Sequence, residues 1–118
     1  MTSELPANTE PQVLATSVSA AAARFELRIP ENLRYFDGHF PGCAILPGVV
    51  QLKWAIDFAR RHWRLKPNFS RLSQVKFTRV IVPGRCVTLD LQVDGDSLGF
   101  QYRIDDTVCS SGSIDFSV

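Results

Sequence analysis

The stretch "PGVVQLKWAIDFARRHW", residues 47–63 of the 118-residue chain, decides the fold. Pro47 suits the first turn of a helix, because the N–H that proline lacks would have no partner there. No proline or glycine follows Gly48 in the stretch. Its apolar residues cover most of a helical circumference: Val49, Val50, Leu52, Trp54, Ala55, Ile56, Phe58 and Ala59. A helix that is apolar nearly all round is a buried one, so the stretch predicts one long helix inside the core.

Strand patterns lie on both sides of this helix. Residues 24–29 alternate, with Phe25, Leu27 and Ile29 on one face. After Pro67, alternation returns in four segments separated by short turns: residues 72–80, 86–93, 98–104 and 108–118. Short connections between successive strands imply antiparallel pairing. We therefore expect an α+β fold in which an antiparallel sheet wraps around the one buried helix.

Length and composition limit the domain organisation and the partners. The chain is long enough for one domain but too short for two. We expect a disordered tail at residues 1–10, which are polar, and a single domain at residues 11–118. A net charge of +1 gives no reason to expect nucleic acid or membrane binding, and no apolar run approaches the ~20 residues of a membrane span. The first residues lack the basic and apolar regions of a signal peptide, which favours the cytoplasm.

The sequence gives no sign of a metal or nucleotide cofactor. Two histidines and three scattered cysteines (Cys43, Cys86 and Cys109) show no metal-ligand spacing, and the cysteines fit reduced thiols better than disulfides. The seven glycines form no phosphate-binding loop. We therefore expect no metal and no other cofactor.

The loop "GHFPGCAILPGVV", residues 38–50, holds His39 ahead of the helix. The Gly48 N–H belongs to the first turn, where it has no helical acceptor and lies at the positive end of the helix dipole. A general base beside such a donor can remove a proton while the N–H stabilises the developing oxyanion. The plainer interpretation is a turn histidine, with Gly48 needed only for close packing.

Three motifs carry a resemblance to a known family. "GHFPG" (38–42), "ILPGVV" (45–50) and "VKFTRVIVPG" (75–84) resemble the hot-dog-fold 3-hydroxyacyl-(acyl carrier protein) dehydratases, and the resemblance covers nearly the whole domain. The variant "ILPGVVQLKWA" (45–55) is most similar to the small dehydratase-like proteins of aryl polyene biosynthesis. The resemblance implies a hot-dog fold. It also implies dehydration of 3-hydroxyacyl thioesters on an acyl carrier protein to trans-2-enoyl thioesters, in fatty acid or aryl polyene-type biosynthesis.

The resemblance also assigns catalytic roles. The family's histidine, which removes the C2 proton, corresponds to His39, and the glycine whose N–H polarises the thioester carbonyl corresponds to Gly48. The family's acid lies fourteen positions after the histidine, where this chain has Lys53. An ammonium can donate a proton to the leaving hydroxyl, and desolvation by an apolar helix face would favour that transfer. Alternatively, Lys53 points to solvent and pairs with Asp57, one turn further on, and Asp57 is the alternative acid.

Substrate and carrier contacts can be predicted less directly. A long acyl chain needs an apolar tunnel, for which Phe36, Phe40 and Trp54 are candidates, although all three suit the core equally well. Basic residues after the helix would dock an acidic carrier protein or simply face solvent: Arg60, Arg61, Arg64 and Lys66.

The sequence also leads to a prediction of a dimer and to two alternative functions. The resemblance implies a homodimer whose sheets join edge to edge, with His39 of one chain facing position 53 of the other. A heterodimer is the alternative. A thioesterase or coenzyme A thioester enzyme on the same fold is a second function. A non-catalytic acyl-thioester-binding subunit is a third, which Lys53 in place of a carboxylic acid favours.

Overall fold

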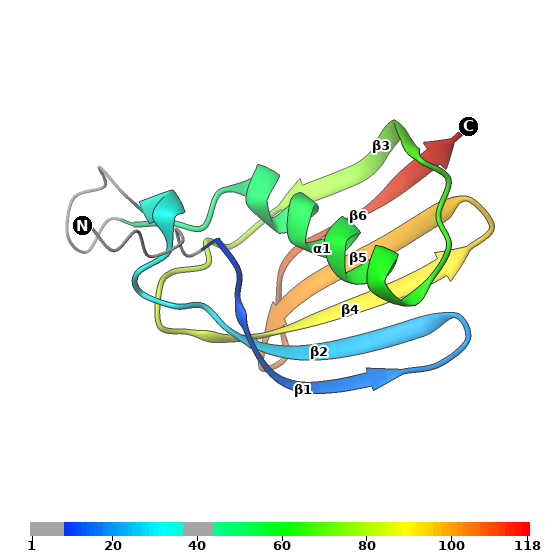
Figure 1. Cartoon of the computed structure of the whole chain (residues 1–118). Helices are drawn as coiled ribbons and strands as arrows, with labels where there is room; N and C mark the ends of the chain where they lie inside the picture. The colour runs from blue at the N-terminus through cyan, green and yellow to red at the C-terminus, as the bar shows by residue number, and fades with distance from the viewer. Residues whose placement is uncertain (1–8, 37–43) are drawn as a thin grey trace, which may run out of the picture.

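One long helix lies across one face of a six-stranded antiparallel sheet in the computed structural model, which describes residues 9–36 and 44–118 (Figure 1). The strand order is β1-β2-β4-β5-β6-β3, and every neighbouring pair is antiparallel. The elements are β1 (Gln12–Val18), β2 (Ala22–Arg28), the 3-10 turn η1 (Arg34–Phe36), α1 (Gly48–His62), β3 (Asn68–Phe77), β4 (Cys86–Asp94), β5 (Ser97–Ile104) and β6 (Thr107–Ser117). This is the hot-dog arrangement predicted above.

The core lies between α1 and the inner face of the sheet. The helix buries one broad side against the strands: Val50, Gln51, Trp54, Ala55, Phe58 and Ala59. The strands alternate as the sequence predicts, so that Phe25 and Leu27 of β2 point inward and are buried. The helix has 15 residues, and no helix in the described ranges is long and apolar enough to cross a membrane.

The structure has one strand more than the sequence predicted. A single strand was expected before the loop, but β1 and β2 form a hairpin whose turn is closed by Ser19, with its N–H donating to the Ala22 carbonyl at 2.8 Å. Every residue of β1 is exposed. An exposed edge strand needs no apolar–polar alternation, and for that reason the sequence pattern missed it.

Strand β3 forms the edge of the sheet opposite β1. Among the described residues it pairs only with β6, and it begins four residues earlier than the predicted segment 72–80. The pairing register breaks between Ser73 and Lys76, where Gln74 has a φ of 55°. Phe69, Leu72 and Phe77 are exposed on this strand. An apolar sheet edge of this kind is a pairing surface for another chain.

A short N-terminal segment packs over the helix. The Thr9 carbonyl accepts a hydrogen bond from the Trp54 indole N–H at 3.0 Å, and Glu10 forms an ion pair with Arg61 at 3.1 Å. Pro11 is buried. Thr9 and Glu10, the last two residues of the predicted tail, therefore lie against α1, while residues 1–8 lie outside the described part of the chain.

Candidate active site

The start of α1 presents backbone N–H groups without helical partners. Pro47 is the N-cap residue in an extended conformation, and its carbonyl accepts the first two hydrogen bonds, from Val50 and Gln51 at 3.1 and 3.2 Å. The Gly48 N–H has no acceptor among the described residues. It therefore remains available for an incoming oxygen atom, at the end of the helix that carries a partial charge of about +0.5.

A pocket of about 260 Å³ opens at this helix start. One wall is the segment that leads into α1, and the other is the end of β3 with the residues after it. The lining residues are Ile45, Leu46, Pro47, Gly48, Gln51, Phe77, Thr78, Arg79 and Val80. The two motifs "ILPGVV" and "VKFTRVIVPG", far apart in sequence, thus meet at one site.

Gly48 is required for the close approach of these two walls. A Cβ atom at position 48 would lie 2.7 Å from Cζ of the Phe77 ring, which is closer than van der Waals contact allows. Glycine at position 48 therefore serves both packing and the proposed chemistry. Because it has no side chain, Phe77 can lie over the helix start, and the Gly48 N–H stays accessible.

Lys53 and Asp57 form an ion pair on the side of α1 that does not face the sheet. The Lys53 ammonium lies 2.6 Å from an Asp57 carboxylate oxygen, and their side chains are 55% and 35% exposed. The pairing that the spacing predicted is therefore observed. Because both side chains reach solvent, a molecule that covers this face of α1 would meet an ammonium and a carboxylate together.

The other predicted residues divide into two groups. Trp54 and Phe36 are buried in the core, and neither lines the pocket at the helix start. His39 and Phe40 lie outside the described residues, so their predicted roles stay predictions. Sequence reasoning missed Gln51, Phe77 and Arg79 as pocket residues, because only the fold brings them to the helix start.

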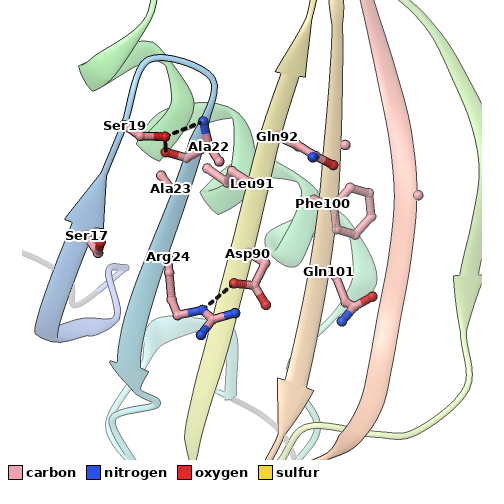
Figure 2. Close-up of a pocket in the computed structure, with 12 residues that line it drawn as sticks. Ser17, Ser19, Ala22, Ala23, Arg24, Asp90, Leu91, Gln92, Phe100 and Gln101 are labelled. Carbon is pink, nitrogen blue, oxygen red and sulfur yellow. Dashed lines mark hydrogen bonds and ion pairs between the residues drawn. The ribbon is translucent and has the colours of Figure 1, made fainter.

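A larger hollow of about 570 Å³ lies on the face of the sheet away from α1 (Figure 2). Arg24 on β2 donates to Asp90 on β4 at 2.7 Å, and the other Asp90 oxygen accepts from Arg103 at 3.0 Å. The hydrogen bond and the charge of Asp90 raise the pKa of Arg24. Of the predicted site residues that the structure describes, none lines this hollow. Despite its smaller volume, the pocket at the helix start is the better candidate, because it holds a donor suited to an oxyanion.

The basic residues in the last turn of α1 and just after it are largely occupied by contacts within the chain. Arg60 donates to the carbonyls of Lys66 and Pro67 and lies over the Phe116 ring, while Lys66 pairs with Asp96 at 2.9 Å. Arg61 pairs with Glu10 in the same way. This end of α1 is opposite the helix start, so a carrier protein docked here would not lie next to the Gly48 N–H.

Comparisons with known proteins identify the family of this chain. The sequence matches the family model described as ApeI-like, ApeI dehydratase, over residues 15–113. The chain is 25% identical over 117 residues to the 3-hydroxyacyl-(acyl-carrier-protein) dehydratase FabZ of Fusobacterium nucleatum, with 91% of this chain and 83% of that protein covered. It is 35% identical over 83 residues to the FabZ of Oenococcus oeni, with 62% and 59% covered. The chain therefore spans less than two thirds of this second relative.

Solved structures extend the likeness to three dimensions. The dehydratase heterocomplex ApeI:P from Xenorhabdus doucetiae contains a chain that is 29% identical, with a TM-score of 0.82 and coverage of 90% of this chain and 96% of that one. An uncharacterised protein from Erwinia carotovora subsp. atroseptica is 30% identical, with a TM-score of 0.69 and coverage of 90% and 94%. With the family match spanning most of the domain, this chain belongs to the ApeI-like dehydratase family.

Proposed function

We propose that this chain dehydrates 3-hydroxyacyl thioesters, carried on an acyl carrier protein, to trans-2-enoyl thioesters in fatty acid or aryl polyene-type biosynthesis. The observation that carries the proposal is the Gly48 N–H, which has no acceptor among the described residues and borders a pocket at a helix start. The names of the FabZ relatives and of the ApeI-like family support this reaction class. His39 precedes the pocket residue Ile45 by six positions in the sequence.

In the proposed reaction, His39 removes a proton from C2 of the substrate. The electrons of that C–H bond become the C2–C3 double bond as the hydroxyl group leaves C3, and a proton donor converts the hydroxyl to water. Negative charge develops on the thioester oxygen during proton removal. The Gly48 N–H and the positive end of α1 stabilise that charge, and loss of such a donor costs about 10²–10³-fold in rate.

We assign the proton donor to Lys53, with Asp57 as the carboxylate that holds its ammonium in place. The position of Lys53, where the family has its acid, supports this role, and a dimer partner that covers this face of α1 would desolvate the ammonium. The 2.6 Å ion pair and the exposure of both side chains in the single chain are what the alternative interpretation predicted. Lysine differs from the family's acidic residue in charge but also carries a transferable proton. Asp57 remains the alternative acid if Lys53 proves dispensable.

We further propose that the active unit is a dimer joined through β3, as a homodimer or with a related subunit. The exposed apolar residues of β3 support an edge-to-edge interface, and the Xenorhabdus doucetiae neighbour is part of a heterocomplex. Light scattering of the purified chain should give twice the 13.2 kDa mass of one chain. Leu72→Lys should shift the protein toward monomers, because it places a charge on the β3 edge.

The matched control for this interface is Leu14→Lys on β1. Leu14 and Leu72 are both exposed on edge strands, but at opposite edges of the sheet. Leu14→Lys should leave the dimer intact. An active monomer at assay concentration, or dissociation by Leu14→Lys but not by Leu72→Lys, would contradict the β3 interface.

The function itself is tested by incubating the purified chain with a 3-hydroxyacyl group on an acyl carrier protein and separating the products by mass spectrometry. Dehydration should give a product lighter by one water with the thioester intact. Release of a free acid would indicate the thioesterase function instead. Unchanged substrate that stays bound would indicate the acyl-thioester-binding subunit, and the assay would then be repeated with a purified related subunit to test the heterodimer.

A further inference from the structure

Gln51 is a buried polar residue in the first two turns of α1, three residues after Gly48. It is only 3% exposed, and its neighbours on the buried side of the helix are apolar. Burial of a carboxamide is unfavourable unless its oxygen and nitrogen both find hydrogen-bond partners. The position therefore raises the question of what this side chain holds in place.

The carboxamide of Gln51 joins the segment before the helix to the sheet. Its Nε2 donates to the Leu46 carbonyl at 3.1 Å, and its Oε1 accepts from the Ser110 hydroxyl of β6 at 2.6 Å. The backbone carbonyl of Gln51 accepts a third bond, from the Tyr102 hydroxyl of β5 at 2.6 Å. Burial raises the pKa of Tyr102 well above its usual value, so this hydroxyl keeps its proton and stays a donor.

The bond from Gln51 Nε2 to the Leu46 carbonyl restrains the peptide group that leads into Pro47 and Gly48. The Leu46 N–H donates to the Ile81 carbonyl at 2.8 Å while the Leu46 carbonyl accepts from Gln51, so both polar groups of Leu46 are held. Only Pro47 separates Leu46 from Gly48, and the proline ring fixes its φ, which is −61° here. The Gly48 N–H shares a peptide plane with the Pro47 carbonyl, which accepts the first two hydrogen bonds of α1. The Gln51–Leu46 hydrogen bond adds to this restraint by holding the segment on the other side of Pro47.

We propose that Gln51 is a positioning residue that aims the Gly48 N–H into the pocket at the helix start. Gln51 itself lines that pocket beside Gly48. The inference rests on the proposed function, because an aimed N–H matters to the rate only if a substrate oxygen binds there. Loss of the Nε2 donor frees the Leu46 carbonyl and lets the segment before Pro47 shift against the helix start, and small misplacements of catalytic groups are costly.

Three variants distinguish an effect on the direction of the Gly48 N–H from a loss of side-chain packing at position 51. Gln51→Met keeps the length of the side chain and removes both polar groups. Gln51→Glu keeps the acceptor for Ser110 and removes the donor to Leu46 at a pH above the pKa of the buried carboxyl, so this variant is assayed over a range of pH. Ser110→Ala is the matched control, because it removes the other hydrogen bond of the same carboxamide and leaves the bond to Leu46. We expect kcat to fall about 10–100-fold in both Gln51 variants, with KM changed less than about threefold, and to stay within about twofold in Ser110→Ala.

A structural readout accompanies the kinetics. The amide resonance of Gly48 in nitrogen–proton correlation spectra should move in the Gln51 variants and stay in place in Ser110→Ala. If Gln51→Met does not fold, Gln51→Glu carries the test. An unchanged kcat and an unmoved Gly48 resonance in a folded Gln51 variant would overturn the proposal. If the wild-type chain shows no dehydration, the proposed function fails, and the Gly48 resonance alone decides whether Gln51 aims this group.

Discussion

Replacement of His39 by alanine is expected to lower kcat for dehydration by about 10²–10⁴-fold, the usual contribution of a general base. Without the imidazole, no group in the "GHFPG" loop can accept the C2 proton, since its other side chains are glycine, phenylalanine and proline. Initial rates with a 3-hydroxyacyl-carrier substrate measure the effect. A thermal melt and a circular dichroism spectrum establish that the variant is folded.

The matched control is the second histidine of the chain. His62 lies at the last position of α1, is exposed, and has its ring 5.6 Å from the ring of Phe25. His62→Ala removes an imidazole from the far end of the helix and should leave kcat nearly unchanged. Near-normal turnover by a folded His39→Ala protein would rule out the mechanism proposed here.

Replacement of Lys53 by methionine is expected to reduce kcat as severely as His39→Ala, because the leaving hydroxyl then has no proton donor. Stability should change little, since an exposed ion pair such as Lys53–Asp57 contributes at most about 1 kcal/mol. Lys53→Glu should recover part of the lost activity, because a carboxylic acid at this position restores the family's pattern. Rates and melting temperatures of the three proteins provide the comparison.

Arg61→Met controls for the loss of an exposed helix cation. Like Lys53, Arg61 is about half exposed and pairs with an acidic side chain, here Glu10. This variant should keep its activity, since it lies eight residues further along α1. A fully active Lys53→Met enzyme would remove Lys53 from the mechanism, and Asp57→Asn would then show whether Asp57 is the acid.

The fold could be predicted wherever burial imposed a pattern. The inward alternation of β2 follows from one buried face, and the structure confirms it. The position of the helix is confirmed as well, but it buries one broad side and leaves Val49 73% exposed, so the prediction of burial nearly all round was wrong. Strand β1 was missed because all its residues are exposed. Neither of its faces is buried, so its sequence does not alternate between apolar and polar residues. The bounds of β3 were shifted for a related reason, since this edge strand carries exposed apolar residues and a break in register at Gln74.

The candidate site could be predicted only in the parts that are local in sequence. Gly48 follows from the "ILPGVV" segment alone, and the Lys53–Asp57 pair follows from a spacing of one helical turn. The Gln51 network could not be predicted, because Ser110 and Tyr102 come from strands that follow much later in the chain. One indication of this network was present in the sequence, which is Gln51 itself, a polar residue between apolar neighbours of the helix.

The pairing of β3 with β6 sets the order in which the protein can be completed during synthesis. Asn68 pairs with Ser117 at one end of this ladder and Phe77 with Ser110 at the other, so β3 stays unpaired on this side until β6 has been synthesised. Contacts of long sequence separation form slowly, and an unpaired apolar strand promotes aggregation in the interval. A chain still on the ribosome therefore exposes both edges of β3. A subunit that binds the outer edge of β3 can recognise it in finished form only after β6 has been synthesised, which couples assembly of the complex to the synthesis of β6.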